Sequence, residues 1–180
     1  MSNLEEKQIC REEIFHGVAL HVVKDEVLLP NGNKSVREIS LHVGASAVIP
    51  ILSDGRVIME RQYRYAHHRV MLEIPAGKLN SHDEDPLEAA KRELREETGA
   101  EAQKYTYLGS IATAPALIDE VIHLYMAEDI SFGDRELDPD EFLDVELIHI
   151  DRLYEMVMKG EIADAKTQIA ILKAKEYLKK

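Results

Sequence analysis

Three glutamates, Glu93, Glu96 and Glu97, lie close together in the segment GKLNSHDEDPLEAAKRELREETGA, residues 77–100. On a helix, side chains three and four positions apart share one face, so these carboxylates would repel by roughly 0.2 to 0.5 kcal/mol per pair. The helix dipole adds a cost of roughly 0.3 to 1 kcal/mol for acidic side chains in the last turn. Two explanations fit: a solvated charged face with ion pairs to Arg92, or a site for a divalent cation such as Mg²⁺, which prefers oxygen ligands.

The sequence around these glutamates predicts a helix with defined ends. Asp85 suits the N-cap, Pro86 the first helical position and Gly99 the C-terminal stop. Glu88 has the spacing of a capping box with Asp85. The apolar positions recur at intervals of three and four residues: Leu87, Ala90 and Leu94. The helix therefore has one face to bury.

The rest of the chain interleaves strands with two further helices. Strand-like runs occupy residues 14–29, 34–43, 45–52, 56–65, 105–113, 120–129 and 144–150, with turn signals at PNGN and SDG. Helices are predicted at residues 151–160, capped by Asp151 and stopped by Gly160, and within residues 164–178. This alternation is typical of a layered α/β domain. A boundary near Val43 and Gly44 separates a β-rich lobe, residues 1–43, from a main domain, residues 44–180.

Composition narrows the class of partner. The chain has 180 residues, 45% of them hydrophobic, and a formal net charge of -12, which argues against nucleic acids and anionic membranes. The opening residues lack the apolar run of a signal peptide, and no apolar stretch is long enough to cross a membrane. The single cysteine, Cys10, excludes an internal disulfide. We therefore expect a soluble cytoplasmic protein with a small-molecule partner.

The glutamate segment resembles the Nudix box, G-x5-E-x7-R-E-U-x-E-E-x-G-U, in which U is a bulky aliphatic residue. The matching residues are Gly77, Glu84, Arg92, Glu93, Leu94, Glu96, Glu97 and Gly99, with Ala100 in place of the last aliphatic. Six residues, rather than five, separate Gly77 from Glu84, so the loop before the helix carries an insertion. From Glu84 onward the spacing agrees.

The resemblance implies a role for each matched position. In Nudix hydrolases, the glutamates that match Glu93 and Glu97 bind a catalytic divalent metal, Mg²⁺ with Mn²⁺ as a substitute. The residue matching Glu96 assists them, and the backbone carbonyl of Ala76 adds an oxygen. The structural positions of the motif are Gly77, Glu84, Arg92 and Gly99, and Arg92 is expected to pair with Glu84. The implied reaction is hydrolysis of a nucleoside diphosphate linked to another group.

The segments beside the box are similar to those of ADP-ribose pyrophosphatases. The likeness lies in RQYRYAHHRVMLEIPAGK and TAPALIDEVIHLYMAE, although Ala116 replaces the usual glycine. It implies hydrolysis of ADP-ribose to AMP and ribose 5-phosphate. The candidate substrate contacts are Arg61, Arg64, Glu73, Pro115 and Glu120. Surface ion pairing is the alternative for the two arginines, and an ordinary surface carboxylate is the alternative for Glu73.

The resemblance also implies an architecture and an assembly. The fold expected is an α/β/α sandwich with a mixed sheet, preceded by a small antiparallel β lobe that packs on a second subunit in a homodimer and contributes to its substrate pocket. The catalytic base is assigned to Glu141, with Asp140 and Glu120 as alternatives. Other substrates remain open, namely a nucleotide sugar, NADH or a dinucleoside polyphosphate, and so does a module that binds ADP-ribose without cleaving it.

Overall fold

The computed structural model describes residues 4–137 and 142–179. The chain divides into two compact units. The first comprises the residues up to Gly44 together with Ala112–Glu120, and the second comprises Ala45–Ile111 and the residues from Val121 onward. In the described residues, no helix combines the length and the apolar character that crossing a membrane requires.

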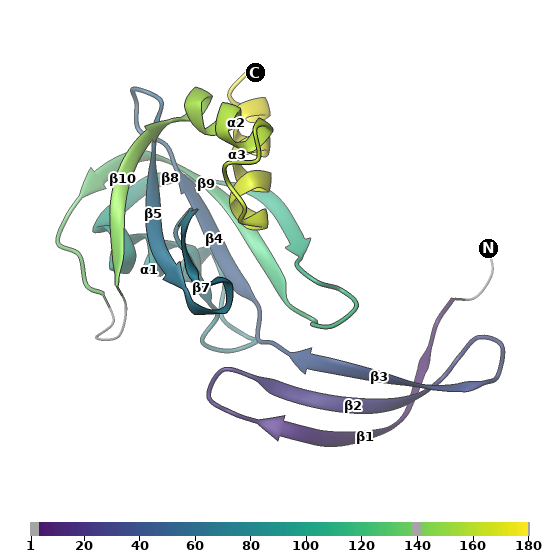
Figure 1. The fold of residues 1–180 in the computed structure, drawn as a ribbon. Coiled ribbons are helices and arrows are strands. Elements are labelled where there is room, and N and C mark those ends of the chain that lie inside the picture. The colour runs from purple at the N-terminus through teal and green to yellow at the C-terminus, as the bar shows by residue number, and fades with distance from the viewer. Residues whose placement is uncertain (1–3, 138–141, 180) are drawn as a thin grey trace. The chain divides into compact units, whose positions relative to one another are not determined.

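The first unit is built on a three-stranded antiparallel sheet in the order β1-β2-β3 (Figure 1). Its strands are β1 (Lys7–His16), β2 (His21–Leu28) and β3 (Lys34–Leu41). The Asn-Gly turn joins β2 to β3, with Gly32 at φ 84°. The prediction of one strand over residues 14–29 is wrong, because a turn closed by Gly17 N–H and the Leu20 carbonyl at 2.8 Å interrupts it.

Cross-strand pairing holds the charged strand β1 in this sheet. All ten residues of β1 are exposed, so little apolar burial fixes it. Arg11 instead donates two hydrogen bonds of 2.7 Å to Asp25 in the central strand. These hydrogen bonds lower the pKa of Asp25, which is buried between Val23 and Val27. Hydrophobic periodicity missed the start of β1 because the strand is charged along much of its length.

The second unit contains two sheets (Figure 1). The four-stranded sheet has the order β7-β4-β9-β8, with β7 (Ala76–Lys78), β4 (Ala45–Pro50), β9 (Val121–Phe132) and β8 (Ala100–Ala112). It is mixed, since β4 runs parallel to β9 and antiparallel to β7. The three-stranded antiparallel sheet has the order β10-β5-β6, with β10 (Leu143–His149), β5 (Arg56–Arg64) and β6 (Arg69–Glu73).

Helices cover the sheets from two sides. They are α1 (Pro86–Thr98), α2 (Ile150–Met158) and α3 (Ala165–Tyr177). Successive residues of β4 point to opposite faces, so Val48 packs with Ala90 and Leu94 of α1, whereas Ala47 and Ile49 join the core that includes α2 and α3. The predicted α/β/α sandwich is confirmed.

The predicted ends of α1 are confirmed. The Asp85 side chain accepts a hydrogen bond from the Leu87 N–H at 2.9 Å, and Pro86 opens the helix. Gly99 closes it at φ 69°, a left-handed conformation that glycine adopts without strain. The Ser46 hydroxyl of β4 donates to the Pro86 carbonyl at 2.7 Å and fixes the start of the helix on the sheet.

One predicted cap is wrong. The N-cap of α2 is His149 rather than Asp151, because β10 leads directly into the helix and leaves Asp151 in its first turn. Asp164 caps α3, accepting a hydrogen bond from the Thr167 N–H at 2.9 Å. The short strands β6 and β7 were not predicted.

Candidate active site

The three glutamates of α1 line one open depression together with the end of β7. Its lining residues are Ala76, Gly77, Lys78, Asn80, Arg92, Glu93, Glu96 and Glu97. The carboxylates differ in burial, since Glu97 is 4% exposed whereas the side chains of Glu93 and Glu96 are 13% and 33% exposed. The helix thus presents acidic groups of graded accessibility to a single polar hollow.

Glu97 is anchored to the strand that faces α1. Its Oε2 atom accepts a hydrogen bond from the Ala76 N–H at 3.0 Å. This contact joins the last turn of the helix to the first residue of β7, 21 residues earlier in the chain. It holds a buried carboxylate in place at the position where the helix dipole alone would disfavour it.

Glu93 occupies the space that a side chain at position 77 would fill. A Cβ atom built on Gly77 would overlap the Glu93 carboxylate, and no other group lies as near. Gly77 therefore permits a close approach of the backbone to the carboxylate. This relation explains why the motif requires a residue without a side chain here, and the reason lies in the tertiary structure.

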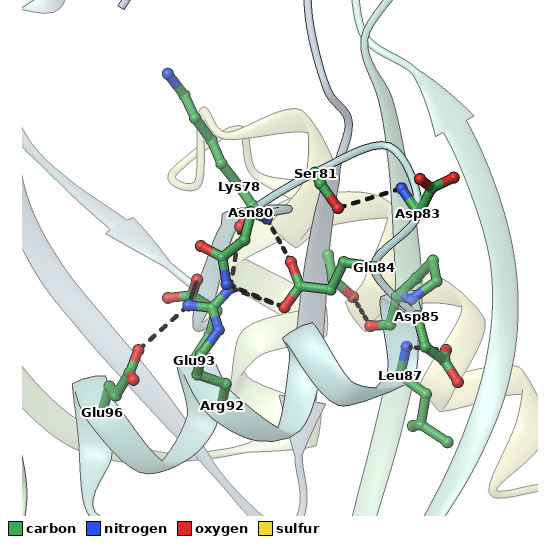
Figure 2. A network of polar contacts seen from close by, with 12 residues as sticks. Lys78, Asn80, Ser81, Asp83, Glu84, Asp85, Leu87, Arg92, Glu93 and Glu96 are labelled. Carbon is green, nitrogen blue, oxygen red and sulfur yellow. Dashed lines mark hydrogen bonds and ion pairs between the residues drawn. The ribbon is translucent and has the colours of Figure 1, made fainter.

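Arg92 links the acidic helix to the preceding loop (Figure 2). Its guanidinium donates to Glu93 at 2.6 Å, to Glu96 at 3.3 Å and to the Lys78 carbonyl at 3.1 Å. Glu84 lies 3.6 Å away. Burial acts to lower the pKa of Arg92, but Glu93 and Glu84 outweigh it and raise that pKa. The fixed positive charge offsets part of the repulsion among the carboxylates.

The extra residue of the loop is absorbed in a local turn (Figure 2). Glu84 accepts hydrogen bonds from the backbone N–H of Asn80 and from its side-chain amide, the latter at 3.2 Å. The Glu84 N–H donates to the Ser81 carbonyl at 3.3 Å, and the Asp83 N–H donates to the Ser81 hydroxyl at the same distance. The insertion therefore leaves Glu84 beside Arg92. Asn80 was missed by the sequence analysis because it belongs to no motif position.

The donor set of the hollow fits a hard divalent cation. Three carboxylates converge there with backbone groups of β7, and the lining contains no cysteine or histidine. Oxygen donors of this kind suit Mg²⁺ or Mn²⁺. Glu93, Glu96 and Glu97 are the residues that would hold the ion, with the Ala76 carbonyl as an additional oxygen.

The predicted substrate residues lie in several places. Arg61 pairs with Glu146 at 2.8 Å. Glu120 lies in the first unit, as Pro115 does, and accepts a hydrogen bond from the Thr113 hydroxyl at 2.7 Å. Glu141, assigned as the base, and its alternative Asp140 lie outside the residues that the structure describes.

Arg64 and Glu73 contact each other in an ion-pair network whose central carboxylate, that of Glu73, is buried. Arg64 donates to the two Glu73 oxygens at 2.7 and 2.8 Å, and Lys166 of α3 reaches the same carboxylate at 2.5 Å. Burial acts to raise the pKa of Glu73, but these cations outweigh it and lower the pKa to about 2. The network joins β5, β6 and α3. Lys166 was not predicted as a partner of Glu73, because it lies 93 residues away and no local pattern relates the two.

Glu73→Gln is expected to lower the free energy of unfolding by about 3 kcal/mol at neutral pH, since it removes the buried carboxylate that Arg64 and Lys166 share. The unfolded state takes up a proton near the ordinary pKa of 4.5, whereas the folded state resists protonation down to about 2. The stabilisation is therefore complete above the higher value and disappears as the pH falls through this window. Urea unfolding of both proteins at pH 7 and pH 3 measures it.

The matched control is Glu155→Gln, which removes an exposed carboxylate paired with Arg152 at 3.4 Å. This substitution is expected to lower the free energy of unfolding by less than about 1 kcal/mol at either pH. A difference between Glu73→Gln and the wild type that stays constant from pH 7 to pH 3 would contradict the assigned pKa.

Comparison with known proteins agrees with this geometry. The NUDIX domain model matches residues 40–169. The ADP-ribose pyrophosphatase of Bacillus subtilis (strain 168) is 43% identical, covering 99% of this chain and 98% of that protein. The methanol dehydrogenase activator of Bacillus methanolicus is 44% identical, covering 97% and 96%.

A solved structure of an ADP compounds hydrolase has the same fold. It superimposes with a TM-score of 0.86 and 23% sequence identity, covering 99% of this chain and 97% of that one. The family model spans most of the second unit, including the β7–α1 hollow with its glutamates. On the family model and the full-length relatives, the chain belongs to the NUDIX domain family.

Proposed function

We propose that this protein hydrolyses the diphosphate bond of ADP-ribose to AMP and ribose 5-phosphate, with Mg²⁺ as its cation. The observation that carries the proposal is the convergence of Glu93, Glu96 and Glu97 on the end of β7. The choice of ADP-ribose is supported by the relative of Bacillus subtilis that is named for this activity and aligns along nearly the whole chain.

Each side chain has a distinct task in this proposal. Mg²⁺, when bound, would neutralise charge at the diphosphate and lower the pKa of an attacking water. Glu97 and Glu93 would hold the ion, since the Ala76 N–H fixes the first and the second lies against Gly77. Arg92 positions Glu93 and Glu96 relative to the loop, so the carboxylates are arranged before the substrate arrives.

A substrate panel tests the assignment. The panel compares kcat/KM for ADP-ribose, a nucleotide sugar, NADH and a dinucleoside polyphosphate, each with Mg²⁺. We expect ADP-ribose to lead by roughly tenfold or more, which corresponds to about 1.4 kcal/mol of transition-state discrimination. A higher kcat/KM for the nucleotide sugar would overturn the choice of ADP-ribose but not the assignment as a diphosphate hydrolase. Binding of ADP-ribose without turnover would identify a binding module instead.

A second candidate function rests on the relative from Bacillus methanolicus. Its identity to this chain is 44%, as high as that of the pyrophosphatase, and its name describes activation of a methanol dehydrogenase. The test adds the purified protein to a methanol dehydrogenase and measures the rate of alcohol oxidation. If a variant that cannot hydrolyse ADP-ribose also fails to stimulate the dehydrogenase, stimulation depends on the hydrolytic site.

Gly77→Ala is expected to lower kcat by about 10²-fold with little loss of stability. The added methyl group meets the far end of a flexible side chain, so the Glu93 carboxylate swings aside while the backbone stays in place. A misplacement of about 1 Å in the groups that hold the cation costs about that factor. Steady-state kinetics and a thermal melt measure the two quantities.

Gly133→Ala is the matched control for this substitution. A Cβ atom there meets nothing nearer than the Gly99 carbonyl oxygen at 3.8 Å, an ordinary contact. We expect wild-type kinetics from it. Equal losses in the two variants, or a Gly77→Ala protein with full activity, would contradict the proposed seat for Glu93.

We propose in addition that the protein is a homodimer formed through the lobe of residues 1–43. The support is the set of apolar side chains that this lobe exposes: Ile9, Ile14, Phe15, Leu20 and Val36. A second subunit would remove them from water, which favours association. Sedimentation velocity is expected to give twice the mass of one chain, and a fully active monomer would refute the assembly.

A further inference from the structure

A second cluster of metal-binding side chain types lies in the first unit, at the end of the β1–β2 hairpin. It consists of Glu13, His16 and His21, whose ligand atoms all lie within 4.8 Å of one another. The His21 Nε2 atom is 3.0 Å from the Glu13 carboxylate, and the His16 Nδ1 atom is 3.9 Å from its other oxygen. None of these residues belongs to the Nudix motif.

The backbone of the hairpin builds this cluster. His16 and His21 face each other across the strands, immediately before and after the Gly17–Leu20 turn. Residues three apart on a regular strand point to opposite faces, so Glu13 and His16 would not meet. A register shift between Glu13 and Phe15 inserts one extra residue there. Such a bulge redirects the side chains and returns Glu13 to the face of the histidines.

We propose that Glu13, His16 and His21 form a binding site for a borderline transition-metal ion of the Zn²⁺ class. Two imidazoles and one carboxylate are the donors that such ions prefer, and three protein ligands leave a fourth tetrahedral position for water. Mg²⁺ prefers all-oxygen surroundings, so the two sites select different metals. The lobe site and the glutamate site share no residue.

The present geometry is close to the one that binding requires. Ligands about 2.0 Å from a tetrahedral ion are about 3.3 Å apart. The Glu13–His21 distance of 3.0 Å is already near this value. The two imidazole rings stack with 12° between their planes and 4.3 Å between centroids, so their nitrogens must turn toward each other. The His16 side chain is 63% exposed and has room for that rotation.

The charges around Glu13 favour a cation. Neighbouring carboxylates of the sheet are paired with fixed positive charges, as Glu12 is with Lys24 and Glu26 with Lys34. Within the described residues, Glu13 contacts only the two histidines among basic side chains. Its negative charge is therefore available to an ion, which competes with protons for the imidazole nitrogens.

Metal binding would add a cross-strand link at the turn end of the hairpin. β1 is exposed along its whole length and is joined to β2 by main-chain hydrogen bonds and by side-chain pairs such as Arg11–Asp25. An ion bound by Glu13 and His16 of β1 and by His21 of β2 closes the hairpin at its turn. Because the ion binds the folded hairpin and not the unfolded chain, it stabilises the lobe in proportion to the logarithm of its concentration.

The test is calorimetric titration of Zn²⁺ into the full-length protein without a histidine tag, in excess Mg²⁺ to occupy the glutamate site. We expect one equivalent of Zn²⁺ to bind, and the same equivalent to bind to Glu97→Gln. Loss of a group that only supports a metal ligand weakens metal binding by roughly 10- to 100-fold. His16→Ala and His21→Ala each remove a ligand itself, so each should weaken Zn²⁺ binding by more than this factor. Co²⁺ should show the intense visible absorption of a low-coordinate nitrogen site in the wild type and in Glu97→Gln, but not in His16→Ala or His21→Ala.

The matched control is the double variant His67→Ala/His68→Ala, which removes an adjacent histidine pair outside the cluster. It should keep the Zn²⁺ equivalent. Circular dichroism of the metal-free variants confirms that they are folded. Wild-type binding by the His16→Ala/His21→Ala double variant, or equal weakening by the control, would overturn the proposal, as would absence of Zn²⁺ binding to the wild type. None of these readouts depends on hydrolytic activity.

Discussion

Glu97→Gln is expected to lower kcat by about 10³-fold or more. The glutamine keeps an oxygen that accepts the Ala76 N–H, so the contact between α1 and β7 persists, but the negative charge that holds the cation is lost. A bound metal contributes several kcal/mol of transition-state stabilisation, and each 1.36 kcal/mol or so is a factor of ten in rate. Steady-state kinetics with ADP-ribose and saturating Mg²⁺ measure the loss.

The same substitution should leave the fold intact. Removing one of two acidic charges four residues apart relieves repulsion of roughly 0.2 to 0.5 kcal/mol, so the metal-free variant should melt no lower than the wild type. Glu88→Gln is the matched control, because Glu88 lies on the same helix, is exposed and pairs with Lys91. We expect near-normal kcat from the control. Near-normal turnover by Glu97→Gln would show that the three glutamates are only a charged helix face and not a metal site.

Removal of divalent metal is expected to abolish hydrolysis. The diphosphate and the acidic hollow repel each other, and within the hollow only Lys78 and Arg92 are cationic. EDTA should therefore reduce the rate to background, and Mg²⁺ or Mn²⁺ should restore it. The measurement is the rate in metal-depleted buffer before and after adding each ion.

Adding back Mg²⁺ alone distinguishes the two proposed metal sites. EDTA also strips ions of the Zn²⁺ class from the lobe, but Mg²⁺ suits only the oxygen donors of the glutamate hollow. Full recovery with Mg²⁺ assigns catalysis to that hollow. Undiminished hydrolysis in metal-depleted buffer would refute the mechanism.

The amino-acid sequence determined the elements whose causes are local. The ends of α1 follow from Asp85, Pro86 and Gly99, each of which acts on its own turn of the helix. The common face of Glu93 and Glu97 follows from their spacing of four residues. The mixed sandwich was predictable because the Nudix-like segment and the alternation of strands with helices agree on it.

Other features were beyond local patterns. The break at Gly17–Leu20 was missed because the turn itself carries apolar residues, Val18, Ala19 and Leu20, and so looks like a continuing strand. The start of β1 was missed because Arg11 and its charged neighbours are held by cross-strand pairs rather than by an apolar face. The same turn and the register shift that follows from strand pairing create the cluster of Glu13, His16 and His21.

The sequence by itself determined which residues carry acidic charge, and on which helix face they lie, because helix geometry relates positions a few residues apart. Only the tertiary structure decided what those charges contact. It joined Glu97 to Ala76, seated Glu93 against Gly77, and paired Glu73 with Lys166 rather than leaving it at the surface. These contacts depend on how sheets and helices pack, and residues 16 to 93 positions apart meet only when the whole core forms.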